Sequence, residues 1–92
     1  MNYYVTMTDV FMSGKGEAEG KLNKLVFECD TLQQAETVEE NARMRGDMSY
    51  IRLGRTKPRF DPDRFYVQVK TIKDYPSWYE RNYFSHARVW TA

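Results

Sequence analysis

The chain has 92 residues, enough for one domain with a modest core and too few for a catalytic cleft and a cofactor site as well. Hydrophobic residues make up 41% of the sequence, charged residues 29%, and the net charge is +1, which is typical of a globular domain. The single cysteine excludes an internal disulfide, and no apolar run approaches the roughly 20 residues of a membrane span. Together these features predict a cytoplasmic protein with one domain over residues 1–92.

The charged residues are distributed unevenly along the chain. Residues 1–46 contain five Lys/Arg and eight Asp/Glu, a net charge of −3, whereas residues 47–92 contain nine and five, a net charge of +4. This asymmetry predicts a basic surface in the second half of the chain.

The first two predicted strands flank a glycine-rich segment. Residues 2–11 are rich in aromatic and β-branched residues, which favour a strand. In the second strand, residues 24–29, the side chains of Leu25, Phe27 and Cys29 share one face. The residues predicted to share one face of the first strand are Tyr3, Val5 and Met7. Two strands on either side of such a connector predict a hairpin with a long loop.

The connector, residues 12–21, reads MSGKGEAEGK and raises the question of a phosphate-binding loop. The Walker pattern does not fit, because Lys15 stands where its first glycine belongs and Leu22 stands where Ser or Thr should follow Gly20-Lys21. The dinucleotide-binding pattern does not fit either, because a strand follows instead of a helix. We therefore predict a mobile hairpin loop in which glycine supplies positive φ angles.

The segment after the second strand predicts the main helix, beginning at Asp30 or Thr31 and ending at Gly46. Thr31 and Gln34 fit the capping-box spacing. The predicted apolar stripe consists of Leu32, Ala35, Val38 and Ala42. The predicted solvent-facing residues are Gln33, Glu36, Thr37, Glu40 and Arg43.

The second half predicts two further strands, over residues 48–53 and 64–72, separated by a loop at 54–63 with two prolines. Pro76 predicts the first turn of a short helix, and residues 85–92 are ambiguous between an edge strand and a docked coil. In the last strand the predicted inward residues are Phe65, Val67 and Val69, and the predicted outward residues are Tyr66, Gln68 and Lys70.

The order ββαββ predicts an α+β fold: a small antiparallel sheet of about four strands, with one main helix on one face and a short C-terminal helix. One helix covers one face of a sheet, so the other face must tolerate solvent, meet a partner or lie under the aromatic C-terminal segment. The aromatic residues of that segment are Tyr75, Trp78, Tyr79, Tyr83, Phe84 and Trp90.

No set of residues predicts catalysis or metal binding. His86 and Cys29 are the only histidine and cysteine, whereas a metal site needs about three or four such ligands. Cys29 lies on the apolar face of its strand, which favours a buried structural thiol over a Cys29–His86 dyad. Glu36, Glu39 and Glu40 are interpreted as a solvated helix face, with a surface for a basic partner as the alternative. The sequence therefore predicts no enzyme, no metal and no cofactor.

Basic residues carry the strongest functional signal: six Lys/Arg lie within residues 43–59, opposed only by Asp47. Arginine matches phosphate oxygens, and cations between tyrosines on an open sheet suit base stacking or a protein hot spot, with ordinary solubility as the alternative. The candidate binding residues are Arg43, Arg45, Arg52, Arg55, Lys57, Arg59, Arg64, Tyr66 and Lys70. The other predicted outward positions of the sheet are Tyr4, Thr6, Tyr50 or Ile51, and Gln68.

Three stretches resemble small proteins carried by bacteriophages and other mobile elements: NYYVTMTD, GEAEGK and KLVFECDTLQQAETVEENARMRGDMSYI. They span the first half to two thirds of the chain. In size and arrangement the chain is similar to small single-domain anti-CRISPR proteins. The resemblance implies a cytoplasmic, non-enzymatic inhibitor that docks on a host nucleoprotein complex and blocks nucleic-acid binding. It carries over no binding residue, because no family motif is available to map.

Three functions remain open on the sequence. The favoured one is an inhibitor whose partner is a protein or nucleoprotein complex of the bacterial host. The second is a small module that binds RNA or single-stranded DNA directly. The third is a structural or assembly protein that forms a homodimer through the uncovered face of the sheet.

Overall fold

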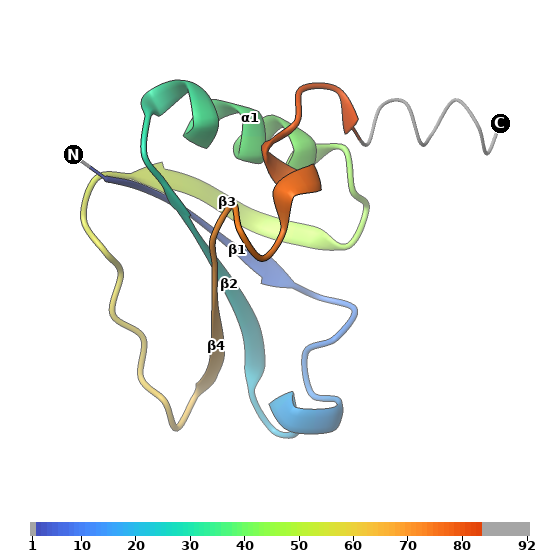
Figure 1. The fold of residues 1–92 in the computed structure, drawn as a ribbon. Coiled ribbons are helices and arrows are strands. Elements are labelled where there is room, and N and C mark those ends of the chain that lie inside the picture. Colours follow the sequence, from blue (N-terminus) through green and yellow to red (C-terminus); the bar gives the residue numbers. More distant parts are fainter. Residues whose placement is uncertain (1, 84–92) are drawn as a thin grey trace, which may run out of the picture.

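The computed structural model describes residues 2–83, which form four strands, one α-helix and two 3-10 turns (Figure 1). This order confirms the predicted α+β fold, with the short C-terminal helix reduced to one 3-10 turn. The ambiguous residues 85–92 lie outside the described part. The elements are β1 (Tyr3–Asp9), η1 (Gly16–Ala18), β2 (Leu22–Cys29), α1 (Leu32–Arg43), β3 (Met48–Gly54), β4 (Phe65–Lys70) and η2 (Pro76–Tyr79).

The sheet has the strand order β3-β1-β2-β4 and is mixed. β1 runs antiparallel to both β2 and β3, as predicted for the hairpin, whereas β4 runs parallel to β2. The expectation of a wholly antiparallel sheet is therefore wrong at β4. The reason is that β3 and β4 occupy opposite edges, so β4 follows a connection across the sheet and not a tight turn.

The core lies between α1 and the face of the sheet that α1 covers, which we call the helix side. The alternation in β1 and β2 places Val5, Met7, Leu25 and Phe27 there, and all four are buried. The buried residues that α1 contributes are Ala35, Thr37, Val38, Asn41 and Ala42. The predicted inward faces of the first two strands are thus confirmed, because alternation in a half-buried strand reports burial directly.

The start of α1 has the predicted cap. Thr31 Oγ1 accepts a hydrogen bond from the Gln34 backbone N–H at 3.1 Å, and Gln34 Oε1 accepts one from the Asp30 N–H at 2.8 Å. Two positions of the predicted pattern are wrong. Leu32, in the first turn, is 46% exposed, and Thr37 is buried, with its hydroxyl satisfied by donation to the Gln33 carbonyl at 2.9 Å.

The end of α1 also differs from the prediction. The helix ends at Arg43, three residues before the predicted stop at Gly46, and Met44 follows as its C-terminal cap. A turn then leads through Arg45 to β3.

The C-terminal aromatic residues pack on the helix side, where η2 lies beside α1 (Figure 1). The Trp78 ring lies 4.6 Å from the Phe27 ring, and the Tyr79 hydroxyl donates to the Glu28 carbonyl at 2.9 Å. Asn41 Nδ2 donates to the backbone carbonyl of Trp78 at 3.0 Å and to that of Glu80 at 2.7 Å, so α1 clamps η2. The interpretation in which this segment covers the other face is therefore wrong for Trp78 and Tyr79. Phe84 and Trp90 lie outside the described residues.

The glycine-rich loop is held by its own hydrogen bonds. Gly14, Gly16 and Gly20 have φ angles of 78°, 55° and 76°, and no heavy atom lies within 4 Å of a Cβ built on any of them. These glycines are therefore present for their backbone conformation and not for close approach to another group. The Gly14 N–H donates to the Lys21 carbonyl at 2.9 Å and closes the loop.

The connection between β3 and β4, residues 55–64, crosses the face of the sheet opposite α1, which we call the open face (Figure 1, yellow). Lys57 Nζ lies 3.4 Å from Glu28 Oε2, and Phe60 packs against Phe65 with ring centroids 5.4 Å apart. Val26, in the middle of the open face, is only 2% exposed. Among residues 2–83, no helix is long and apolar enough to cross a membrane.

Candidate nucleic-acid interface

The two faces of β4 are the reverse of the prediction. The register pairs Gln68 with Leu25 and Lys70 with Phe27, so the polar residues of β4 lie on the helix side. Phe65, Val67 and Val69 lie on the open face, where both valines remain partly exposed. Alternation shows which residues share a face of a strand. In a strand at the edge of the sheet, such as β4, it does not show which of the two faces is turned toward the core.

The nine candidate residues therefore do not form one patch. Arg52 lies on the open face, and Lys57 forms a salt bridge with Glu28, whose side chain is on that face. Tyr66 and Lys70 lie on the helix side. Arg59 and Arg64 are exposed in the connection between β3 and β4.

The other three arginines are engaged by neighbouring side chains. Arg43 pairs with Glu39 at 3.2 Å, and Arg55 Cζ lies 5.5 Å from the centre of the Tyr3 ring. Arg45 donates two hydrogen bonds of 2.9 Å to the Asp47 carboxylate, and its guanidinium carbon lies 5.0 Å from the Trp78 ring.

A β-bulge in β3 presents a tyrosine on the open face. The register places Arg52 opposite Thr6 and Ser49 opposite Thr8, so two residues of β3, Tyr50 and Ile51, oppose one residue of β1. Tyr50 has a φ of 53°, in the left-handed region that non-glycine residues rarely adopt, and it is 72% exposed. Bulges and strained residues of this kind are concentrated at functional sites, where they redirect a side chain.

Three aromatic rings surround the Lys24 ammonium on the open face. Its Nζ lies 5.6 Å from the centre of the Tyr50 ring and 5.5 Å from the centres of both Phe60 and Phe65. These contacts join β2, β3, β4 and the crossing connection at one point. Each is within the distance at which a cation is attracted to a ring face.

Lys24 and Arg52 are like charges on the same face of the sheet, with β1 between their two strands. Burial, and then repulsion from Arg52, lower the pKa of the Lys24 ammonium. Within residues 2–83, neither Lys24 nor Arg52 forms a salt bridge with an acidic side chain. A bound anion between them would relieve the repulsion, because opposite charge favours the protonated form of the lysine.

This group, which we call the cation–tyrosine patch, consists of Lys24, Tyr50 and Arg52. It offers a guanidinium for phosphate oxygens, an ammonium beside it and an exposed ring for stacking. These are the components with which proteins hold single-stranded nucleic acid or an exposed nucleic-acid segment of a complex.

Sequence reasoning identified Arg52 and left Tyr50 open with Ile51, but it missed Lys24 as a site residue. The signal for Lys24 was present, because it alternates with the apolar inward residues of β2 and therefore faces outward. The contact with Tyr50 could not be inferred, since it depends on the bulge.

The other candidate chemistry lies apart from this patch. Cys29 is 1% exposed, and burial raises the pKa of its thiol to about 11, which leaves it protonated at neutral pH. His86, the other residue of the dyad that the sequence disfavours, lies outside the described residues. No group of three or more His, Cys, Asp or Glu that could hold a metal is found within residues 2–83.

Comparison of the chain with protein-family models, with curated proteins and with solved structures gives no match.

Proposed function

We propose that this chain is a non-enzymatic binding protein that docks on a bacterial nucleoprotein complex and blocks its binding of nucleic acid, in the manner of anti-CRISPR inhibitors. The cation–tyrosine patch supports the proposal: two cations on the same face of the sheet, neither paired with an acidic side chain in residues 2–83, accompany a tyrosine that is 72% exposed. On a complex that carries nucleic acid, such a patch contacts phosphate and base together.

The position of the patch supports occlusion instead of catalysis. It lies on the open face, where the crossing connection and four strands hold it in place, and the buried Cys29 thiol faces the helix side. Docking through this face places the rest of the domain, about 37 Å across, over the surface that the complex would use.

A second function, direct binding of RNA or single-stranded DNA, is favoured by the same exposed tyrosine ring. The two functions differ in their response to salt and nuclease. If Lys24 and Arg52 each neutralise one phosphate, the logarithm of the affinity for a bare oligonucleotide should fall with the logarithm of salt concentration with a slope of about −1.4. An inhibitor that recognises a protein surface would bind the bare strand weakly.

The test is capture of partners from bacterial lysate, with and without nuclease, by the wild type and by Arg52→Glu. Arg81→Glu is the matched control, because Arg81 is an exposed arginine that follows η2. A defined nucleoprotein complex retained after nuclease treatment by the wild type and Arg81→Glu, but lost with Arg52→Glu, supports the inhibitor.

Two outcomes would overturn the inhibitor. In one, the wild type captures only material that nuclease removes, and Arg52→Glu captures none of it. That outcome would indicate direct binding of nucleic acid. Unchanged nucleic-acid binding by the captured complex in the presence of excess wild-type protein removes inhibition altogether.

A further inference from the structure

A groove on the helix side runs between the glycine-rich loop and η2, away from the cation–tyrosine patch. It consists of two adjoining cavities of about 220 and 250 Å³, and Met12, Asn23 and Gln68 line both. Each cavity is smaller than the roughly 300–1,000 Å³ of a typical small-molecule site, so each has room for one or two side chains of a ligand.

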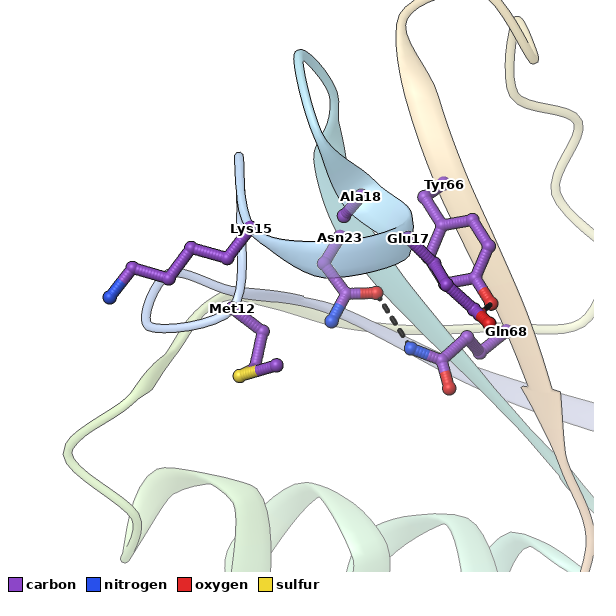
Figure 2. Close-up of a pocket in the computed structure, with 7 residues that line it drawn as sticks. All are labelled: Met12, Lys15, Glu17, Ala18, Asn23, Tyr66 and Gln68. Carbon is purple, nitrogen blue, oxygen red and sulfur yellow. Dashed lines mark hydrogen bonds between the residues drawn. The ribbon is translucent and has the colours of Figure 1, made fainter.

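A chain of hydrogen bonds crosses the floor of the groove. Lys70 Nζ donates to Gln68 Oε1 at 3.0 Å and to the Tyr75 hydroxyl at 2.9 Å. Gln68 Nε2 in turn donates to Asn23 Oδ1 at 2.8 Å (Figure 2). The chain links β2, β4 and the segment that leads to η2.

Lys70 fixes the direction of this chain. An ammonium is only a donor, so the oxygen of the Gln68 amide must face Lys70 and its nitrogen must face Asn23. Asn23 then presents its oxygen to Gln68 and its Nδ2 to the groove. Figure 2 shows that nitrogen pointing into the space between Met12 and Gln68.

The Asn23 Nδ2 is therefore a hydrogen-bond donor directed into the groove. The residue is only 4% exposed, and its Nδ2 donates to no group within residues 2–83. Because this nitrogen is reached by solvent, an acceptor oxygen of a ligand would replace a water there. The Lys70 ammonium has a third N–H that neither Gln68 nor Tyr75 uses.

The charges at the groove favour a carboxylate. Two acids lie at the α1 end, and both act on Arg45: Asp47 through two hydrogen bonds and Asp9 through its charge, and together they raise the Arg45 pKa. No acidic side chain within residues 2–83 pairs with Lys70. Lys70 is thus a cation of the groove that no acidic side chain of residues 2–83 neutralises. Lys15, which lines the other cavity, is a second such cation, and Glu17 beside it accepts a hydrogen bond from the Tyr66 hydroxyl.

Two aromatic rings that line the groove, those of Trp78 and Tyr75, are poorly placed for bases. Trp78 is only 7% exposed, with the Phe27 ring on it at 4.6 Å and the Arg45 guanidinium at 5.0 Å. Lys70 Nζ lies 4.2 Å from the centre of the Tyr75 ring. The remaining walls offer apolar surface, from Met12, Leu25 and Met48 among others, which suits aliphatic side chains.

We infer that the helix-side groove binds an extended peptide segment of a partner protein in which a carboxylate side chain lies between apolar residues. The carboxylate accepts from Lys70 and from Asn23 Nδ2, and the flanking apolar side chains fill the two cavities. This site is independent of the cation–tyrosine patch and of the function proposed for it.

The test is selection of random linear peptides displayed on phage against the immobilised full-length protein. We expect enrichment of peptides with Asp or Glu flanked by apolar residues. Lys70→Met should lower the affinity of the selected peptides about tenfold or more, because a hydrogen bond to a charged group is lost. Lys73→Met is the matched control and should leave it unchanged, since Lys73 is an exposed lysine just beyond β4.

Gln68→Glu is the sharper variant, because it keeps the shape of the side chain and reverses the hydrogen bond between position 68 and Asn23. The new carboxylate neutralises Lys70 and accepts from Asn23, whose oxygen then faces the groove. Acidic peptides should lose affinity although circular dichroism shows a folded protein. Arg52→Glu, on the other face, should retain them, which separates this site from the proposed function.

Three results would each overturn the inference. One is a selection without acidic enrichment. Another is equal affinity of acidic peptides for the wild type and folded Gln68→Glu. The third is competition in which a single-stranded oligonucleotide displaces the peptides equally well from the wild type and from Arg52→Glu. That result would mean that the groove itself binds the oligonucleotide.

Discussion

Tyr50 allows a test of backbone strain, because its φ of 53° should reverse the usual order of glycine and alanine. A left-handed conformation costs an L-residue about 1–2 kcal/mol, and glycine avoids that cost. Glycine in a strand loses about 0.5–1 kcal/mol to backbone entropy relative to alanine. The difference predicts that Tyr50→Gly is more stable than Tyr50→Ala by about 0.5–1 kcal/mol.

The comparison of glycine with alanine isolates the strain because both variants lack the ring and its contact with Lys24. The assay is urea unfolding followed by tryptophan fluorescence, with Trp78 as a buried reporter that is 7% exposed. In thermal unfolding the same difference corresponds to a midpoint about 2–8 °C higher for Tyr50→Gly.

The matched control lies two residues further along the same strand. Arg52 does not have a positive φ, so Arg52→Gly should be less stable than Arg52→Ala by about 0.5–1 kcal/mol. Equal or lower stability of Tyr50→Gly than of Tyr50→Ala would refute the strain at the bulge. Both Tyr50 variants should bind the partner of the patch equally weakly, since neither carries the ring.

Three further outcomes follow from side chains on the helix side. Asn41→Leu should cost about 2 kcal/mol of unfolding free energy in urea, because two carbonyls of the η2 segment lose their donor; a loss well below that value would contradict the clamp. Cys29 should resist iodoacetamide below pH 9.0 in the native protein and react in urea, because burial raises its thiol pKa from 9.0 to about 11; similar rates in the two states, by mass spectrometry, would contradict this. Asp47→Asn should cost less than about 1 kcal/mol at neutral pH, because both partners of its ion pair are about one-third exposed. Hydrogen bonds from Arg45 lower the Asp47 pKa below 3.8, so the contribution of Asp47 is present above that value and disappears as the pH falls through the lowered pKa. Denaturation of the wild type and Asp47→Asn should therefore converge in strong acid.

Local patterns predicted those features of the fold that depend on neighbours in the sequence. The cap at Thr31 and Gln34 is formed within one turn, and the core faces of β1 and β2 follow from alternation. The parallel β4 could not be predicted in this way. Its position depends on a connection that crosses the whole sheet, and nothing in residues 64–72 records the edge to which the strand attaches.

The reversed faces of β4 had the largest effect on the candidate site. Val67 and Val69 have the alternation of core residues, yet they lie on the open face and are 37% and 45% exposed. Gln68 and Lys70 read as surface residues, yet they form the floor of a groove beside α1. The polar character of such a floor resembles that of a solvated face, so hydrophobicity alone does not separate the two.

The edge position of β4 also sets an order for assembly of the protein. Within residues 2–83, eight of the nine buried residues of the main core come from the stretch of sequence that runs from β1 to the end of α1, and the ninth, Trp78, comes after β4. During synthesis the segment up to β3 can collapse around α1 before β4 has left the ribosome. β4 and η2 then attach to a formed scaffold. Within residues 2–83, β4 is hydrogen-bonded to one neighbouring strand and β1 to two, so the amides of β4 should exchange with solvent through smaller openings than those of β1.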